Sequence, residues 1–198
     1  MPWGVDQAPR RVPAVAPPGE ERARVRECIW LFLAGALLGY GCRAWLVDVR
    51  LVPTPSMRPT LEVGDRLVID KFTPRWGGLA HGDIVVFAAP PEAHLAGEMV
   101  KRVVALPGER LALRQGRLWV DDRPVLLAAS SGELPGQEPD WNALGMPGGT
   151  VPLDHLFVMG DDPRNSTDSR VFGPVPQARV TGLARVGVWP WHRVRLLH

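Results

Sequence analysis

The segment EMVKRVVAL, residues 98–106, decides the fold class of this chain. Half of its apolar residues are β-branched valines, and the run is bounded by turn-forming residues, which is typical of a β-strand. Because side chains alternate between the two faces of a strand, Met99, Lys101 and Val103 are expected on one face. The amine of Lys101 would then lie among hydrocarbon side chains, and Arg102 would point the other way.

Further short β runs lie on either side of this segment and are separated by turns. They are RLVID at 66–70, DIVVFAA at 83–89, RLALR at 110–114, RLWV at 117–120, LFVMG at 156–160 and ARVGVWPW at 184–191. Gln115-Gly116 predicts a hairpin between RLALR and RLWV. The 21 Gly and 21 Pro favour turn-rich β structure over a helical bundle. We therefore predict one mostly β domain, residues 48–198, with an irregular excursion at about 126–149.

The overall composition excludes several classes of function. The formal net charge is +2, from 23 basic and 21 acidic residues, which gives no field that favours nucleic acid as a partner. Both cysteines, Cys28 and Cys42, precede the β domain, so that domain has neither a disulfide nor a cysteine nucleophile. The five histidines are scattered without ligand-like spacing. We expect no metal and no cofactor.

The N-terminal part predicts a membrane anchor. Residues 1–27 are rich in Pro and charged residues, which indicates a cytoplasmic tail with little packed structure. Residues 28–47, CIWLFLAGALLGYGCRAWLV, carry Arg43 as their only charge and are long enough for one transmembrane helix. Arg22, Arg24 and Arg26 precede this segment, so the positive-inside rule keeps the N-terminus in the cytoplasm. The β domain is then expected on the outer face of the cytoplasmic membrane.

Two alternatives to this anchor are open. A cleaved signal peptide requires a small-residue cleavage site, whereas Trp45, Leu46 and Val47 follow the apolar run. A buried helix of a soluble protein is the second alternative, because the uncharged run ends at Cys42. Arg43 near the end of a membrane helix can reach the interface, which favours the membrane interpretation.

Ser56 is a candidate nucleophile. It lies in VPTPSMRPTLEVGD, residues 52–65, between Pro53, Pro55 and Pro59, and proline fixes φ and holds this segment in a rigid extended or turn conformation. The alternative is a Pro-rich linker that leaves the membrane.

Lys101 is the candidate base. Lys71 and Lys101 are the only lysines, so the chain uses Arg wherever a plain positive charge suffices. Burial penalises the charged form of an amine and lowers its pKa, so a buried lysine can act as a general base near neutral pH. Arginine stays protonated and cannot do this. The alternative is a strand lysine whose amine reaches water.

A polar turn follows the strand at 156–160. The segment FVMGDDPRNSTDSRVFGPV, residues 157–175, is crowded with Asp, Asn and Ser, which bond to their own backbone in turns. A calcium loop is disfavoured, because the spacing of the acids does not match the helical calcium motif.

Four segments in this order resemble the conserved boxes of type I signal peptidases, the bacterial leader peptidases. They are PTPSMRPTL, GDIVVF, VKRVVALPGE and MGDDPRNSTDSR, and the closing VWPWHRV resembles the end of that family. The resemblance covers residues 28–192 in outline, apart from residues 126–149. It implies a β domain of antiparallel sheets, preceded by a single transmembrane helix. It also implies an endopeptidase that removes signal peptides from exported preproteins, with membrane lipid as a further partner, and we expect a monomer.

The resemblance further implies roles for single residues. Ser56 is the nucleophile, Lys101 the general base, and Ser166 the hydroxyl that hydrogen-bonds and orients the amine. Thr54 completes the oxyanion hole with the backbone N–H of Ser56. Asp168 and Arg170 form an ion pair that braces the site, and Asp161 is the conserved acid of the turn. The residues that match the substrate groove, which accepts small side chains one and three places before the cut, are Val52, Pro53, Met57, Leu61, Met99 and Val100.

Two departures from the family pattern are Pro55, in place of a small residue, and DDPRNS, in place of DNRDNS, so we assign no role to Pro163 or Arg164. Two other functions stay open. A self-cleaving repressor shares the Ser/Lys chemistry but carries a DNA-binding helix-turn-helix that is not expected here. An inactive membrane-tethered module would bind preproteins without cutting them.

Overall fold

The structure is a computed structural model that describes residues 18–76, 78–125, 134 and 139–197. The chain divides into two compact units, Met1–Gly41 and Cys42–His198. Each is described by itself, and the second is called the β unit below.

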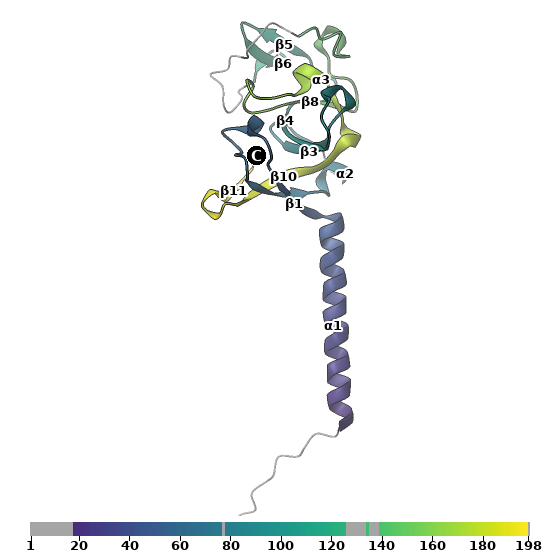
Figure 1. Cartoon of the computed structure of the whole chain (residues 1–198). Coiled ribbons are helices and arrows are strands. Elements are labelled where there is room, and N and C mark those ends of the chain that lie inside the picture. The colour runs from purple at the N-terminus through teal and green to yellow at the C-terminus, as the bar shows by residue number, and fades with distance from the viewer. Residues whose placement is uncertain (1–17, 77, 126–133, 135–138, 198) are drawn as a thin grey trace, which may run out of the picture. The chain divides into compact units, whose positions relative to one another are not determined.

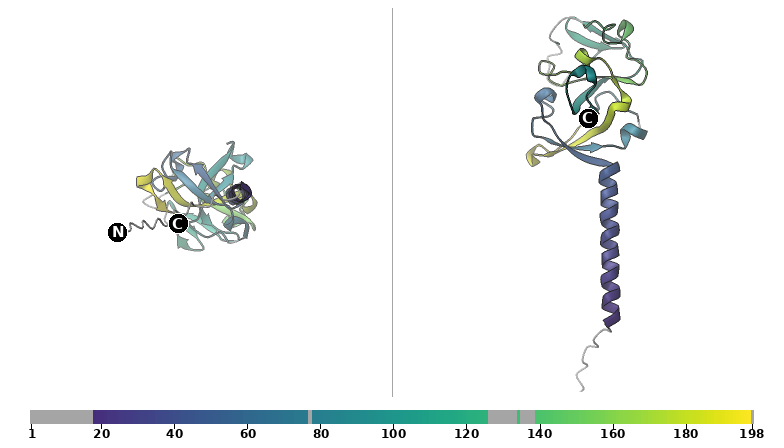
Figure 2. Two further views of the ribbon diagram at one scale, coloured as in Figure 1. Left: turned by 90° about the horizontal axis from the view of Figure 1, so that it is seen from below. Right: turned by 45° about the vertical axis from the view of Figure 1, so that its right-hand side comes forward.

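Helix α1, Pro18–Trp45, is one continuous helix (Figures 1 and 2). It begins ten residues before the predicted membrane segment, and the rest of the predicted tail, residues 1–17, lies outside the described residues. From Ile29 to Leu33 five consecutive side chains are 50–75% exposed, and they point to all sides because successive residues turn by about 100°. Among the described residues, none of the helices combines the length and the apolar character that a membrane crossing requires.

The main sheet of the β unit is antiparallel, with the strand order β1-β2-β10-β3-β4-β8-β9 and β11 paired to β10. Its strands are β1 Val47–Leu51, β2 Arg66–Asp70, β3 Ile84–Ala88, β4 Glu98–Ala105, β8 His155–Met159, β9 Val175–Pro176, β10 Val180–Trp189 and β11 Arg195–Leu196. The short helices between them are α2 Thr73–Trp76 and α3 Ser169–Phe172, with 3-10 turns η1 Pro55–Met57, η2 Pro91–Ala93, η3 Pro147–Gly149, η4 Gln177–Arg179 and η5 Trp191–Arg193.

A second, three-stranded sheet has the order β5-β6-β7, Leu111–Arg114, Arg117–Val120 and Arg123–Pro124. The turn between β5 and β6 has positive φ at both Gln115 (51°) and Gly116 (73°), the conformation that a two-residue hairpin of this kind requires. The predicted hairpin and the mostly β fold with antiparallel sheets are thus confirmed. Figure 1 shows β5 and β6 at one end of the β unit and β1 and β11 at the other, with β3, β4 and β8 between them.

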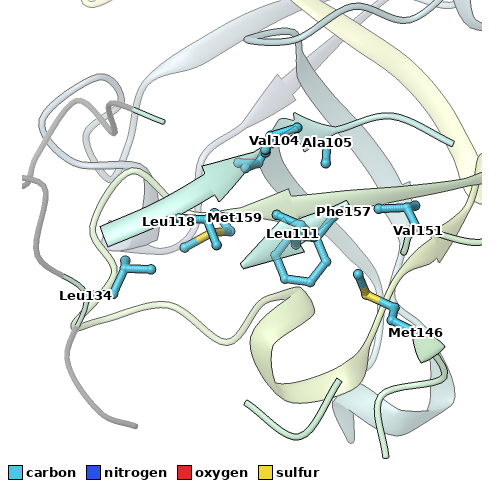
Figure 3. Close-up of a cluster of buried hydrophobic side chains, with 10 residues drawn as sticks. Val104, Ala105, Leu111, Leu118, Leu134, Met146, Val151, Phe157 and Met159 are labelled. Atoms are coloured by element: carbon cyan, nitrogen blue, oxygen red, sulfur yellow. The ribbon is translucent and has the colours of Figure 1, made fainter. Parts of the chain in front are cut away.

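One hydrophobic cluster joins the two sheets. Side chains of β4, β5, β6 and β8 point towards one another there (Figure 3). The predicted irregular excursion contributes to this cluster as well, because Met146 is fully buried and Trp141 packs edge-on against Phe157 at 6.0 Å between ring centroids. Residues 126–133 and 135–138 of the excursion lie outside the described residues.

A second cluster, called the lower core, supports the segment around Ser56. It comprises Val52, Met57, Leu61, Leu67, Ile69, Ile84, Val86, Ala184 and Leu197, with Val100 packed against it. A third cluster packs on β3, β4 and β8 and includes Phe87, Val103 and Leu156. Because successive side chains of β4 alternate, Val100 packs against one cluster and Val103 belongs to the other.

Candidate active site

Ser56 lies in the 3-10 turn η1, directly after β1 and a short extended link. Pro55 begins the turn and Thr54 before it is extended, as the proline-rich sequence indicates. The first hydrogen bond of the turn runs from the Arg58 N–H to the Pro55 carbonyl at 3.0 Å. The Ser56 N–H lies before this donor in the chain, so no carbonyl of the turn accepts it. The carbonyl of Ser56 accepts the N–H of Asp162 at 3.0 Å. The serine, which is 4% exposed, is thereby fixed to the polar turn after β8.

Lys101 reaches Ser56 from β4. Its Nζ donates to Ser56 Oγ at 2.6 Å, and the lysine is 3% exposed. Burial lowers the pKa of Lys101 from 10.5 to about 8, while Asp168 raises it, Arg170 lowers it and Asp161 raises it. At pH 7 roughly one tenth of the amine is therefore neutral and able to accept a proton.

Thr54 also lies beside the nucleophile. Its Oγ1 is 3.3 Å from Ser56 Oγ, and its side chain is exposed. The Thr54 hydroxyl is therefore a hydrogen-bond donor beside the nucleophile, where an anionic oxygen can be stabilised.

Asp168 and Arg170 form the predicted ion pair. Arg170 Nε and Nη2 donate to the two carboxylate oxygens of Asp168 at 2.8 and 2.9 Å, and Asp168 is fully buried. Asp168 also accepts the Gly160 N–H at 3.1 Å, and Arg170 Nη2 donates to the Pro163 carbonyl at 2.9 Å. The pair thus ties both ends of the polar turn together.

Asp161 has a partner that the sequence did not reveal. Arg102 donates hydrogen bonds to both carboxylate oxygens of Asp161 at 2.7 Å and also to the Gly82 carbonyl at 2.7 Å. Strand alternation predicted that Arg102 points away from Lys101, but it gave no sign of a partner 59 residues further along the chain. Through this pair, the strand that carries the lysine also holds the turn that bonds Ser56.

The predicted hydrogen bond from Ser166 to Lys101 does not form. Ser166 Oγ is buried without a hydrogen-bond partner among the described residues. Its hydroxyl instead lies against Gly160, where a Cβ added to the glycine would collide with it. Ser166 therefore lies near Ser56 but makes no hydrogen bond to the Lys101 amine.

A groove of about 250 Å³ opens beside Ser56 and Lys101. Five of the six residues predicted for a substrate groove line it, Val52, Pro53, Met57, Met99 and Val100. Leu61 is a correction, because it is fully buried in the lower core, where its N–H bonds the Met57 carbonyl at 2.8 Å. The sequence did not indicate the remaining wall, which is formed by Leu95, Ala96, Glu98, Asn165 and Thr167. Within the described residues no cluster of three His, Cys, Asp or Glu side chains is placed to hold a metal ion.

Comparison with known proteins identifies the family of the chain. The family model described as signal peptidase, peptidase S26, matches residues 25–189. The chain is 34% identical to a probable signal peptidase I-1 of Synechocystis, over 85% of each chain. It is also 34% identical to a signal peptidase I of Leptolyngbya laminosa, over 95% of this chain and 91% of the relative. An inactive signal peptidase IA of Staphylococcus aureus is 29% identical, over 76% of this chain and 84% of the relative. The chain therefore belongs to the signal peptidase family, peptidase S26, and is a serine peptidase.

Proposed function

We propose that this chain removes N-terminal signal peptides from exported preproteins, with Ser56 as nucleophile and Lys101 as general base. The observation that carries the proposal is the distance of 2.6 Å between Lys101 Nζ and Ser56 Oγ, at a place where both residues are almost fully buried. A neutral amine at this distance can take the hydroxyl proton as the oxygen attacks a peptide carbonyl.

The reaction then follows from the neighbouring groups. Ser56 Oγ bonds to the carbonyl carbon of the residue before the cut, and its proton moves to Lys101 Nζ. The Ser56 N–H and the Thr54 hydroxyl donate to the resulting oxyanion. Lys101 returns the proton to the leaving amine, which departs as the new N-terminus. A water molecule then attacks the carbonyl of the acylated serine while the same amine takes its proton. The bond to Ser56 Oγ breaks, the peptide leaves with a new carboxyl end, and Lys101 returns the proton to Ser56 Oγ.

Strand pairing supports an extended substrate. On its β8 side, β4 is paired only from Arg102 onward, so residues 98–101 have a free edge within the described part of the chain. Val103 N–H bonds the Asp83 carbonyl, and the Gly97 carbonyl accepts Ala89 N–H, both towards β3. Backbone groups alternate in direction, so those of Glu98 and Val100 face the free edge. An extended peptide can add to this edge as a further strand, with its side chains in the groove.

We also propose that α1 anchors the peptidase in the cytoplasmic membrane, with the N-terminus inside and the β unit on the outer face. The exposed apolar side chains of α1 support this, since they point to all sides of the helix. Residues 28–42 carry no charge over about 22 Å. Arg24 and Arg26 favour the stated orientation. Preproteins and lipid would be the partners, and the monomeric state remains a prediction.

The test is processing of a preprotein by the full chain and three variants. Lys101→Arg keeps the charge but cannot supply a neutral amine, so processing should fall by several orders of magnitude, and Ser56→Ala should be equally inactive. Lys71→Arg, the matched control at the other lysine, should process normally. An active Lys101→Arg enzyme would refute the assignment of Lys101 as the general base.

Carbonate washing tests the anchor separately. The chain should remain with membranes at alkaline pH, and protease added outside spheroplasts should digest the β unit. Release of the whole chain by carbonate would refute the anchor without touching the proposed chemistry.

A second candidate is an inactive module that binds preproteins, because one of the relatives carries the word inactive in its name. Ser56 and Lys101 are both present here and in contact, which favours activity. Binding of a preprotein without cleavage by the unmodified chain would favour the module instead.

A further inference from the structure

Four charged side chains form a row beside the far end of the groove. Lys71 Nζ lies 3.3 Å from Asp48 Oδ2, which lies 3.2 Å from Arg50 Nη1, and Arg50 Nε lies 2.9 Å from Glu98 Oε2. Glu98 Oε1 accepts the Thr181 hydroxyl at 3.0 Å. We call this row the charge ladder. It connects β1 and the residue that follows β2 to the first residue of β4.

Only one end of the charge ladder reaches the groove. Glu98 lines the groove, whereas Arg50, Asp48 and Lys71 do not. Of the side chains that line it, Glu98 and Lys101 are the two that ionise, and Lys101 lies at the opposite end beside Ser56. The Glu98 side chain is one-third exposed, so a bound peptide can approach it.

Arg50 forms an ion pair with the Glu98 carboxylate. In the pairing of β1 with β2, Arg50 stands opposite Leu67, a residue of the lower core, so its side chain lies on the sheet face that supports the groove. Its guanidinium is divided between Asp48 and Glu98, and it therefore neutralises the groove carboxylate only in part.

Strand geometry says which substrate residue meets Glu98. In the proposed reaction the residue before the cut lies beside Lys101, and a peptide that runs parallel to β4 towards Ser56 along its free edge advances by one residue for each residue of β4. Glu98 is three strand steps away, about 10 Å, and so stands beside the fourth residue before the cut.

We propose that Glu98 is a specificity-determining residue that selects substrates by charge at the fourth position before the cut, favouring a basic over an acidic side chain, and that Arg50 limits the strength of this selection. The inference rests on the proposed signal-peptide cleavage. It adds a selection by charge to the selection for small side chains that the apolar walls of the groove provide. An ion pair at an exposed site changes cleavage by a factor of about three, which sets the expected size of the preference.

The experiment measures kcat/KM of the full chain in detergent on three signal-peptide substrates that differ only in Lys, Gln or Glu at the fourth position. The unmodified chain should cut in the order Lys, Gln, Glu. Glu98→Gln, which can still accept the Thr181 hydrogen bond, should abolish the difference between Lys and Glu. Arg50→Gln should widen it by a further factor of about three, because Glu98 loses its counterion.

Lys71→Gln is the matched control. It removes the same charge from the same ladder, but at the end away from the groove, and should leave the ratio of Lys to Glu substrates unchanged. High salt should reduce the ratio in the unmodified chain, since exposed charges are screened.

Two results overturn the inference. One is equal cleavage of the three substrates by the unmodified chain, and the other is a Glu98→Gln variant that slows all three by one common factor, which is the sign of a structural role. If the unmodified chain cuts none of them while Ser56→Ala behaves the same, the proposed function itself fails, and the inference falls with it.

Discussion

The chemistry of Lys101 depends on a balance between burial and neighbouring charges. Withdrawal from water favours the neutral amine, while the carboxylates of Asp168 and Asp161 favour the ammonium. Arg170 shares Asp168 and offsets part of that attraction. The result is an amine with a pKa of about 8, close enough to neutrality to exchange protons with a serine hydroxyl.

The rate of cleavage should therefore rise with pH. Because the active form of Lys101 is deprotonated, kcat/KM should increase by about tenfold per pH unit below the pKa and level off above a pH of about 8. The measurement is a pH profile with a short peptide substrate. A profile that is flat or falls between about pH 6 and 8 would contradict a neutral lysine base.

The pair between Arg102 and Asp161 should be important for stability. Asp161 is fully buried, and Asp161→Asn would leave the guanidinium without its counter-charge, which should cost about 3 kcal/mol of unfolding free energy in a denaturant titration. Cleavage should also slow, because the next residue, Asp162, bonds the Ser56 carbonyl.

An exposed pair of the same kind serves as control. Arg114 and Asp122 are joined at 2.7 Å but are 55% and 79% exposed, so Asp122→Asn should change the unfolding free energy by no more than about 1 kcal/mol. Equal losses in the two variants would mean that burial of Asp161 has no energetic role.

The elements differ in how well the sequence predicted them. The valines and flanking turns of β4 predicted the strand, and side-chain alternation predicted the opposite directions of Lys101 and Arg102. Strand β10 begins at Val180, four residues before the predicted run, because Thr181 and Gly182 interrupt the apolar pattern. Strand β1 was missed, since its first residue continues the apolar segment of α1.

Contacts across the fold were less accessible to sequence reasoning. Leu61 and Met57 are both apolar residues beside the nucleophile, and nothing local distinguishes a groove wall from the core beneath it. Ser166 has the expected place, yet the position of its hydroxyl depends on packing against Gly160, which the pattern does not encode. Glu98 lines the groove only because β4 lacks a neighbour at its first residues.

The correction at Leu61 leads to a prediction about the lower core. Leu61→Ala should reduce the unfolding free energy by about 2–5 kcal/mol, because it leaves a cavity among buried side chains, while the preference for a small residue before the cut stays the same. Met99→Ala, in the groove wall, should relax that preference with a smaller loss of stability. Relaxed specificity in the Leu61→Ala variant would mean that Leu61 does line the substrate groove.

The whole molecule consists of two units, and the candidate active site lies in the second. All residues of the proposed chemistry lie in the β unit, which has its own hydrophobic clusters, and α1 contributes none of them. The first strand of the β unit begins at Val47, directly after α1 ends.

Deleting residues 1–45 should therefore leave a folded domain that cuts short peptides at close to the rate of the full chain. Cleavage of preproteins in membranes should fall, because enzyme and substrate are no longer held on one surface. Circular dichroism checks the fold of the shortened chain, and peptide assays check its activity. A folded but inert β unit would show that α1 does more than anchor.

The alternation of side chains along β4 has one more consequence, which concerns how activity arises during folding. Lys101 and Arg102 are adjacent, so pairing β4 one residue out of register would turn Lys101 to the outside and present a guanidinium to Ser56. A guanidinium does not release its proton, and such a chain would have no working base. In the proposed mechanism such copies would lack a working base, so the correct register of β4 is a condition for activity.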